Sequence, residues 1–263
     1  MASLATSVLH FINKLFRCVF MNHLFSSALN LRLNRVMVRG LPATQSGTTG
    51  GRSTRMVVGL GNPGMERTRH SVGMAVISAL ADHLGVANRW GGDRSVCGDV
   101  IMTEVHGSPL VLLRPRRMMN INGVCVAKAA AKYGIKPENI LLVHDELDKP
   151  LGKMSIKQGG SARGHNGVRS CVECLQTDVM PRLRVGIGRP AGRTSVERHV
   201  LTGFSSEEQN IVNCVLVQSV ELLLLQLEHP KAQQNSSCSP AKGRRTKRNG
   251  QHAVTQDEAA EGS

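Results

Sequence analysis

The sequence predicts an α/β fold: a single domain with a twisted, mostly parallel central sheet flanked by helices, and disordered N- and C-terminal extensions. Strand-like and helix-like patterns alternate over residues 56–230, which is typical of a parallel sheet. Of the 263 residues, 41% are apolar, which is enough for a globular core. Only 3% are aromatic, so Val, Leu, Ile, Ala and Met must fill that core.

The first half of the domain predicts a strand, a helix, a hairpin and a second helix. The strand is "MVVGL", and apolar residues at helical spacing follow it from Val72 to Leu80, with a stop near Gly85. "CGDVIMTEV" and "PLVLLRP" flank "HGSP" as a β-hairpin. "NGVCVAKAAAKYG" predicts a helix that ends at Gly134.

The second half continues the alternation. "NILLVHDELD" predicts a strand that runs into a loop, and "GKMSIKQ" and "RLRVGIG" predict strands on either side of a helix, "GHNGVRSCVECLQ". Ser205 and Glu208 form a capping-box pattern ahead of a long Leu/Val-rich helix that ends near His229.

Three segments differ in charge. Residues 1–55 hold seven of the 33 basic residues and no acidic one, which is typical of a mitochondrial presequence. Asn13, Lys14 and Arg17 interrupt its apolar stretch, so we expect neither a secretory signal nor a membrane span. The prediction is a mitochondrial protein, and a leader without an address, on a cytoplasmic protein, is the alternative. Residues 231–263 predict a low-complexity polar tail.

The formal charge of +14 indicates a polyanionic partner but says nothing about the fold. Most of this charge lies at the ends of the chain, because residues 56–230 hold twenty basic and sixteen acidic residues. The seven cysteines are an odd number without a disulfide-framework spacing, which favours a reducing compartment. Cys171 and Cys174 are predicted to be core thiols on one helical face.

A glycine-rich turn after the first strand spells the G-x-G-x-x-G dinucleotide fingerprint at Gly59, Gly61 and Gly64. In a dinucleotide fold the third glycine lies inside the helix, but here the helical pattern begins only near Ser71. No acidic residue follows at the end of a second strand, so we expect no nucleotide cofactor.

Polar residues follow several predicted strands, and the carboxyl ends of such strands line the ligand crevice in open α/β sheets. We therefore expect one groove lined by asparagine, histidine and aspartate. Close spacing along one strand points successive side chains to opposite faces, so "HDELD" is not expected to bind a metal. The residues concerned are Asn62, His70, Met118, Met119, Asn120, His144, Asp145, Glu146, Asp148, His165 and Asn166.

Six blocks of this chain, in family order, resemble the bacterial-type peptidyl-tRNA hydrolases: "VVGLGNPG", "TRHSVG", "MNINGVCVAK", "VHDELDKPLGKMSIKQGG", "GHNG" and "RLRVGIGRP". The resemblance covers roughly residues 56–230. It implies a monomeric enzyme without metal or cofactor that hydrolyses the ester between a peptide and the 3′ ribose of tRNA.

The resemblance assigns the catalytic base to His70 and its carboxylate partner to Asp145. Ester hydrolysis needs a base that activates water, and histidine accepts a proton near neutral pH. A carboxylate that orients the imidazole forms the His–Asp half of a triad, with water in place of serine. Taken alone, His70 is equally consistent with a capping or packing role, and Asp145 with a turn residue.

The resemblance also assigns substrate contacts. Asn62 matches the position that selects blocked peptidyl ends, and Asn120 and Asn166 match amides that hold the ester and the peptide backbone. Met118 and Met119 are expected to line an adaptable side-chain groove. The asparagines are also common turn formers, which is the alternative for each of them.

Lys157 and Arg184 match basic residues near the tRNA acceptor end and are expected to contact phosphates. The chain departs from the family in three places: the loop from Asn62 to His70 is two residues shorter and lacks a tyrosine, Ser71 replaces an asparagine, and Arg163 replaces a glycine before G-H-N. Arg163 is therefore expected to add a phosphate contact. The alternative function is a non-catalytic RNA-binding module on the same fold.

Overall fold

A computed structural model describes residues 53–228 of the chain. The predicted tail and all but the last three residues of the predicted leader lie outside the described residues. Arg55 of that leader belongs to the domain: its Nη1 donates to the carbonyl oxygens of Gln226 and Leu227, each at 3.0 Å.

The described residues form one seven-stranded sheet with the order β2-β3-β4-β1-β5-β7-β6. β4, β1, β5 and β7 are parallel, whereas β2, β3 and β6 pair antiparallel with their neighbours. The mostly parallel sheet is confirmed. The strands are β1 (Arg55–Gly59), β2 (Gly91–Asp93), β3 (Gly98–Val105), β4 (Ser108–Pro115), β5 (Ile140–Glu146), β6 (Met154–Gln158) and β7 (Pro181–Gly186).

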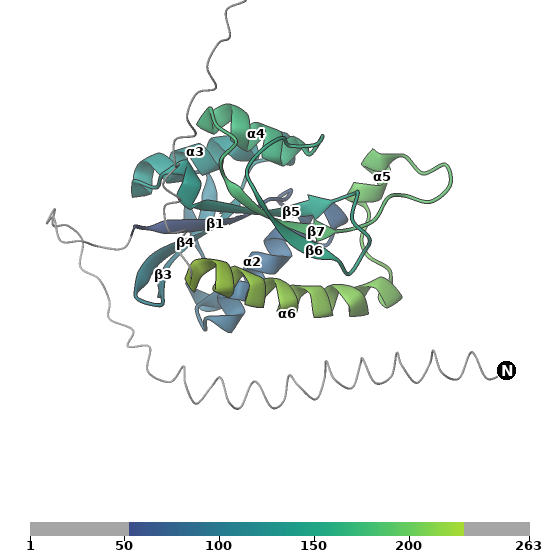
Figure 1. The fold of residues 1–263 in the computed structure, drawn as a ribbon, viewed down its shortest axis with the longest axis horizontal. Helices are drawn as coiled ribbons and strands as arrows, with labels where there is room; N and C mark the ends of the chain where they lie inside the picture. Colours follow the sequence, from purple (N-terminus) through teal and green to yellow (C-terminus); the bar gives the residue numbers. More distant parts are fainter. Residues whose placement is uncertain (1–52, 229–263) are drawn as a thin grey trace, which may run out of the picture. The chain divides into compact units, whose positions relative to one another are not determined.

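Helices cover both faces of the sheet: α3 and α4 lie on one side, and α2 and α6 on the other (Figure 1). Val57 and Leu141 pack toward α2 and α6, while Met56 and Leu142 pack toward α3 and α4, because successive strand residues face opposite sides. The helices are α2 (Val72–His83), α3 (Asn122–Tyr133), α4 (Asn166–Leu175), α5 (Val196–Leu201) and α6 (Ser206–Glu228), with short 3₁₀ turns η1 (Arg69–Ser71), η2 (Ala87–Arg89), η3 (Met119–Ile121) and η4 (Pro137–Asn139).

The predicted elements are present, and two further ones lack a strong sequence signal. β2 contains two glycines, and α5 is only six residues long. The capping box is confirmed, since Ser205 Oγ accepts from Glu208 N–H at 3.3 Å and Glu208 Oε2 accepts from Ser205 N–H at 2.7 Å. The prediction for the cysteines is half wrong, because Cys171 is buried but Cys174 is exposed.

α6 is long and apolar enough to cross a membrane by length and composition alone. Within the described residues it packs on α2 and β7, with Val215 and Leu223 buried in the core. Such packing is what a core helix of an α/β domain does.

The glycine-rich turn serves helix packing. A Cβ on Gly59 would lie 2.4 Å from the Gly73 carbonyl oxygen, and one on Gly73 would lie 2.2 Å from the Val143 carbonyl oxygen. Because neither glycine has a side chain, α2 can lie directly against the ends of β1 and β5. This close approach accounts for Gly59 of the fingerprint, whereas Gly64 adopts a left-handed φ of +78° that favours glycine.

Candidate active site

Three predicted site residues lie where strands β1, β4 and β5 end or just beyond, and a fourth lies on a turn that packs against β5. Asn62 follows β1, Met119 follows β4 and opens η3, and Asp145 is the penultimate residue of β5. His70 lies on η1, which packs against β5. The parallel strands thus bring together residues that are far apart in sequence, as expected for an open α/β sheet.

His70 and Asp145 form the central pair. His70 Nδ1 lies 2.9 Å from Asp145 Oδ1, and the carboxylate side chain is only 3% exposed. Because Nδ1 faces an acceptor, it carries the ring proton, and the lone pair is on Nε2. The imidazole is 12% exposed, and because Nδ1 is engaged by Asp145, Nε2 is the nitrogen left to accept a proton. This is the geometry of an oriented base.

His165 is a second imidazole on the same carboxylate oxygen. Its Nε2 lies 2.9 Å from Asp145 Oδ1, and its ring centroid lies 5.0 Å from that of His70. Its Nδ1 accepts the N–H of Val168 at 3.2 Å and caps α4. Because Nδ1 accepts this hydrogen bond, the ring proton is on Nε2, which donates to Asp145.

Burial alone would raise the pKa of Asp145, but the imidazoles of His165 and His70 hold that pKa well below its usual range. Two N–H donors on one oxygen stabilise the ionised carboxylate. Asp145 is therefore an anion at every pH where histidine titrates, and it can stabilise a proton gained by His70.

His144 completes a cluster of three imidazoles. Its ring packs edge-on against His165 at 4.6 Å, and its Nδ1 donates to the main-chain oxygen of Asp145 at 2.6 Å. Burial is the main cause that lowers the pKa of His144 to about 3. His144 is therefore a neutral structural group beside the site.

The His70, Asp145 and His165 ligand atoms lie within 4.8 Å of one another, which is a donor set that divalent metals can use. His165 Nε2 carries its proton, however, because Nδ1 caps α4. Binding a metal at Nε2 would require the other tautomer and would break the cap. The donor set therefore suits a hydrogen-bonded carboxylate better than a metal.

Asn62 is 3% exposed and has a fixed amide orientation. Its side-chain Oδ1 accepts the main-chain N–H of Met119 at 2.7 Å, and the main-chain N–H of Asn62 donates to Ser71 Oγ at 3.1 Å. Since Oδ1 must face the Met119 donor, the Nδ2 donors point elsewhere. Ser71 thus positions Asn62, which is a role that the sequence did not suggest.

The predicted substrate contacts differ in accessibility. Met118, Asn120 and Asn166 are exposed. The two asparagines lie on neighbouring elements, because η3 packs against α4. Met119 is 4% exposed and packs in the core, so its main-chain N–H, and not its side chain, faces the site. Arg163 is exposed and Lys157 is half-buried.

Arg184 is partly neutralised. Its guanidinium lies 3.4 Å from Glu146 Oε2 and donates to Ser155 Oγ at 3.2 Å, with 19% of the side chain exposed. The remaining carboxylates of "HDELD" are also engaged elsewhere, since Asp148 pairs with Arg189 at 2.6 Å. These contacts support the expectation that "HDELD" does not gather around a metal.

Two residues that support the site were not predicted from the sequence. Asn122, fully buried, binds both the N–H and the carbonyl of Gly61 at 3.1 and 3.2 Å and so holds the Asn62 turn. Arg69, next to His70, lies 2.6 Å from Glu208 and stacks over Phe204 at 4.9 Å. An asparagine before glycine and an arginine inside "TRH" could have indicated both.

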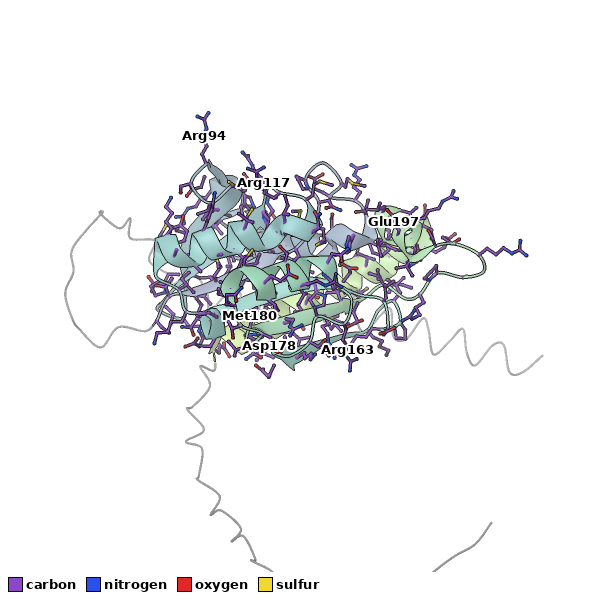
Figure 2. The ribbon with its side chains drawn as sticks, turned by 90° about the horizontal axis from the view of Figure 1, so that it is seen from above. Arg94, Arg117, Arg163, Asp178, Met180 and Glu197 are labelled. Carbon is purple, nitrogen blue, oxygen red and sulfur yellow. The ribbon has the colours of Figure 1, made fainter. Side chains whose placement is uncertain are left out.

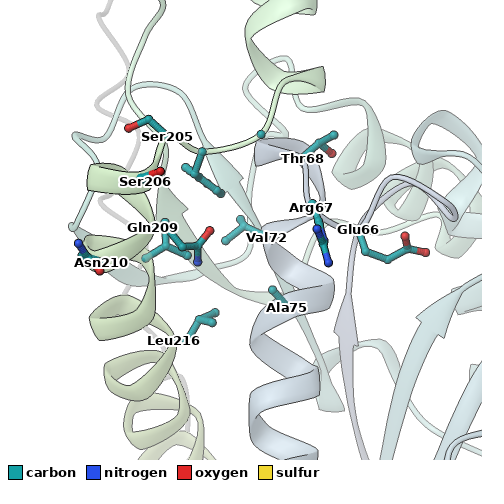
Figure 3. A pocket seen from close by; sticks show the side chains of 13 residues that line it. Glu66, Arg67, Thr68, Val72, Ala75, Ser205, Ser206, Gln209, Asn210 and Leu216 are labelled. Atoms are coloured by element: carbon teal, nitrogen blue, oxygen red, sulfur yellow. The ribbon is translucent and has the colours of Figure 1, made fainter.

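A cavity of about 760 Å³ lies between the first turns of α2 and α6 (Figure 3). Glu66, Arg67 and Thr68 border it, but none of the predicted site residues lines it. The candidate chemistry is therefore identified by the His–Asp geometry and not by cavity size.

The model of the family described as "Peptidyl-tRNA hydrolase" matches residues 56–246. A mouse protein named "Probable peptidyl-tRNA hydrolase" is 53% identical over 184 residues, which are 70% of this chain and 89% of that protein. A peptidyl-tRNA hydrolase of Rhodococcus opacus is 40% identical over 176 residues, with 66% of this chain and 92% of that protein covered.

Solved structures agree. A crystal structure of peptidyl-tRNA hydrolase from Acinetobacter baumannii has 34% sequence identity and a TM-score of 0.62, and the match covers 69% of this chain and 93% of that one. The family match, the relatives and the shared fold give one answer: this chain belongs to the peptidyl-tRNA hydrolase family.

Proposed function

We propose that this chain hydrolyses the ester that joins a peptide to the 3′ ribose of tRNA, with His70 as the general base. The observation that carries this proposal is the 2.9 Å contact between His70 Nδ1 and Asp145 Oδ1, which leaves Nε2 as the accessible proton acceptor. Nε2 takes a proton from water as its oxygen attacks the ester carbonyl. The same proton then passes to the departing 3′ oxygen, and the second proton of the water leaves the new carboxyl group, so the products are a peptide carboxylate, free tRNA and a released proton.

Asp145 supports this step in two ways. Its oxygen fixes the His70 tautomer, and its negative charge stabilises the imidazolium that forms. His165 holds the carboxylate from the other side, with its ring fixed by the α4 cap. We propose His165 as a positioning residue that acts through Asp145.

Asn62 supplies donors for the oxygen that becomes negative. Its Oδ1 is occupied by Met119 N–H, so Nδ2 is left to donate to the ester carbonyl as charge develops there. The exposed amides of Asn120 and Asn166 hold the peptide backbone, and Met118 offers an adaptable apolar contact to its side chains.

Lys157 and Arg184 are proposed phosphate contacts for the acceptor end. They lie on β6 and β7, which pair next to β5, and so extend the surface away from His70. Both residues are proposed to bind the sugar-phosphate backbone of the tRNA without reading its bases.

We also propose the organisation expected from the sequence: a mitochondrial leader over residues 1–55, a catalytic domain over 56–230 and a polar tail over 231–263, acting as a monomer. The acid-free composition of the leader supports the address. A fusion of residues 1–55 to a fluorescent protein tests it, and diffuse cytosolic fluorescence would contradict it.

The test of the reaction compares N-acetyl-aminoacyl-tRNA with unblocked aminoacyl-tRNA. We expect wild-type protein to release tRNA from the blocked substrate only, His70→Ala to retain only a small residual rate of release, and His83→Ala, at an exposed histidine, to leave release intact. Unchanged release by His70→Ala would refute the base. tRNA binding without any release would favour the RNA-binding alternative, for which the His70–Asp145 contact has no use.

A further inference from the structure

Arg163 has a backbone conformation that its residue type disfavours. Its φ is +46°, in the left-handed region where a Cβ is crowded. Gly160 and Gly164, on either side, have φ of +84° and +83°, where glycine carries no such cost. Arg163 therefore carries a side chain at a position that glycine would occupy more easily.

The surrounding loop holds this conformation. Arg182, 2% exposed, donates to the carbonyl oxygen of Ser161 at 3.0 Å and also to that of Gly160. Lys157 Nζ donates to the same Ser161 oxygen at 3.2 Å. His165 N–H donates to Ala162 at 3.0 Å. The loop that contains Arg163 is thus fastened on both sides and leads directly into the candidate active site.

The Arg163 side chain contributes nothing to this fastening. Its main-chain N–H lies 3.3 Å from Ser161 Oγ, a contact that glycine would keep. Among residues 53–228, no carboxylate lies within 4 Å of its guanidinium, and Figure 2 shows the side chain at the surface. A structural role for the side chain is therefore not supported.

Arg163 adds to a local excess of positive charge. Burial, followed by nearby Arg182, Arg163 and Arg184, lowers the pKa of Lys157, so these cations lie close together. Glu146, paired with Arg184, is the acidic group among the causes of this shift. An anion bound here would relieve the repulsion, and a guanidinium suits a phosphate because it can donate two parallel hydrogen bonds.

We propose that Arg163 binds a phosphate of the tRNA acceptor end, and that this contact is what keeps an arginine at a position strained for any residue but glycine. The proposal rests on the proposed function, which supplies the tRNA. The phosphate is either the 5′-terminal one or one within the acceptor strand, and both have the same chemistry.

The test uses three variants of Arg163 and one control. Arg163→Gly should raise Tm by about 2–4 °C through relief of strain, yet raise KM for N-acetyl-aminoacyl-tRNA on the order of fivefold at unchanged kcat. It should also lower the slope of log KM against log salt by about one, as expected for a lost phosphate contact.

The other variants separate charge from strain. Arg163→Ala should match Arg163→Gly in KM but keep the wild-type Tm, since alanine is also strained at this φ. Arg163→Lys should keep most of the affinity. Gln176→Gly, at another left-handed non-glycine (φ +55°), should raise Tm without changing KM. N-acetyl-aminoacyl-adenosine, which has no phosphate, should show no effect of Arg163.

Each outcome either supports or overturns the proposed phosphate contact or the strain argument. A wild-type KM and salt slope in Arg163→Gly would overturn the proposal, as would an equal rise in KM for the adenosine substrate. A Tm that does not rise would overturn the strain argument. If Arg163→Gly no longer raises KM on 5′-dephosphorylated tRNA, Arg163 contacts the terminal phosphate. If the rise in KM persists, Arg163 contacts a phosphate within the acceptor strand. Should wild-type protein hydrolyse nothing, the proposed function fails, and binding of uncharged tRNA still tests Arg163.

Discussion

His144 gives the protein a sensitivity to acid that can be calculated from its burial. The side chain lies behind Asp145, and its Nδ1 donates to the main-chain carbonyl of that residue. Its Nε2 is buried and has no hydrogen-bond partner among the described residues. Burial, the largest cause, lowers its pKa to about 3, whereas a histidine in an unfolded chain titrates near about 6.5.

Between these two pKa values the unfolded chain binds a proton that the folded protein does not. Stability due to neutral His144 is therefore fully present above about pH 6.5 and is lost as the pH falls toward 3. The loss is about 1.4 kcal/mol per pH unit, so about 3 kcal/mol at about pH 4.5.

The variant His144→Asn removes this titration and keeps an amide N–H near the place of Nδ1. It loses ring packing at every pH, which is a constant offset. Urea unfolding at about pH 7.5, 5.5 and 4.5 should show that the variant loses about 3 kcal/mol less than wild type on acidification. His83→Asn, at an exposed histidine, is the matched control and should keep the wild-type slope.

If His144→Asn keeps the wild-type dependence on pH, then His144 is already protonated in the folded protein or titrates normally, and the argument from burial is refuted.

Three further substitutions test the site. Asp145→Asn should lower kcat by about 10³–10⁴ through loss of the His70 tautomer and charge, with KM little changed. Asn62→Asp keeps the oxygen that accepts from Met119 but removes the donors, so kcat for the blocked substrate should fall by about 10²–10³. Asn122→Ala leaves the buried N–H and carbonyl of Gly61 without hydrogen-bond partners. It should therefore lower the free energy of unfolding by about 3 kcal/mol in urea titrations.

Each of these has a contradicting outcome. A rate within tenfold of wild type in Asp145→Asn would remove Asp145 from the mechanism, and an unchanged kcat in Asn62→Asp would remove the amide donors. Asn122→Ala with wild-type stability would mean that water replaces the lost contacts.

Much of the fold was predictable because apolar periodicity and turn residues are local signals. The hairpin around "HGSP" and the capping box at Ser205 follow from such patterns and are confirmed. β2 was missed because its pairing with β3 gives it strand geometry that its glycines do not indicate.

The sequence named residues of the candidate site but did not predict their contacts. The motifs that carry the family resemblance named His70 and Asp145, whereas the shared oxygen with His165 depends on where α4 begins relative to β5. The burial of Met119 depends on η3 packing against α4, which no local pattern records. The loop that contains Arg163 is likewise fastened by Arg182 on β7, which donates to the carbonyl oxygen of Ser161.

The central claim is that His70 and Asp145 act as one unit, and a double-mutant cycle on kcat for N-acetyl-aminoacyl-tRNA tests it most directly. We expect the variant that carries both His70→Ala and Asp145→Asn to be no slower than His70→Ala alone, because Asp145 acts only through that imidazole. Rate losses that multiply in the double variant would show that the two residues act independently and would contradict the account.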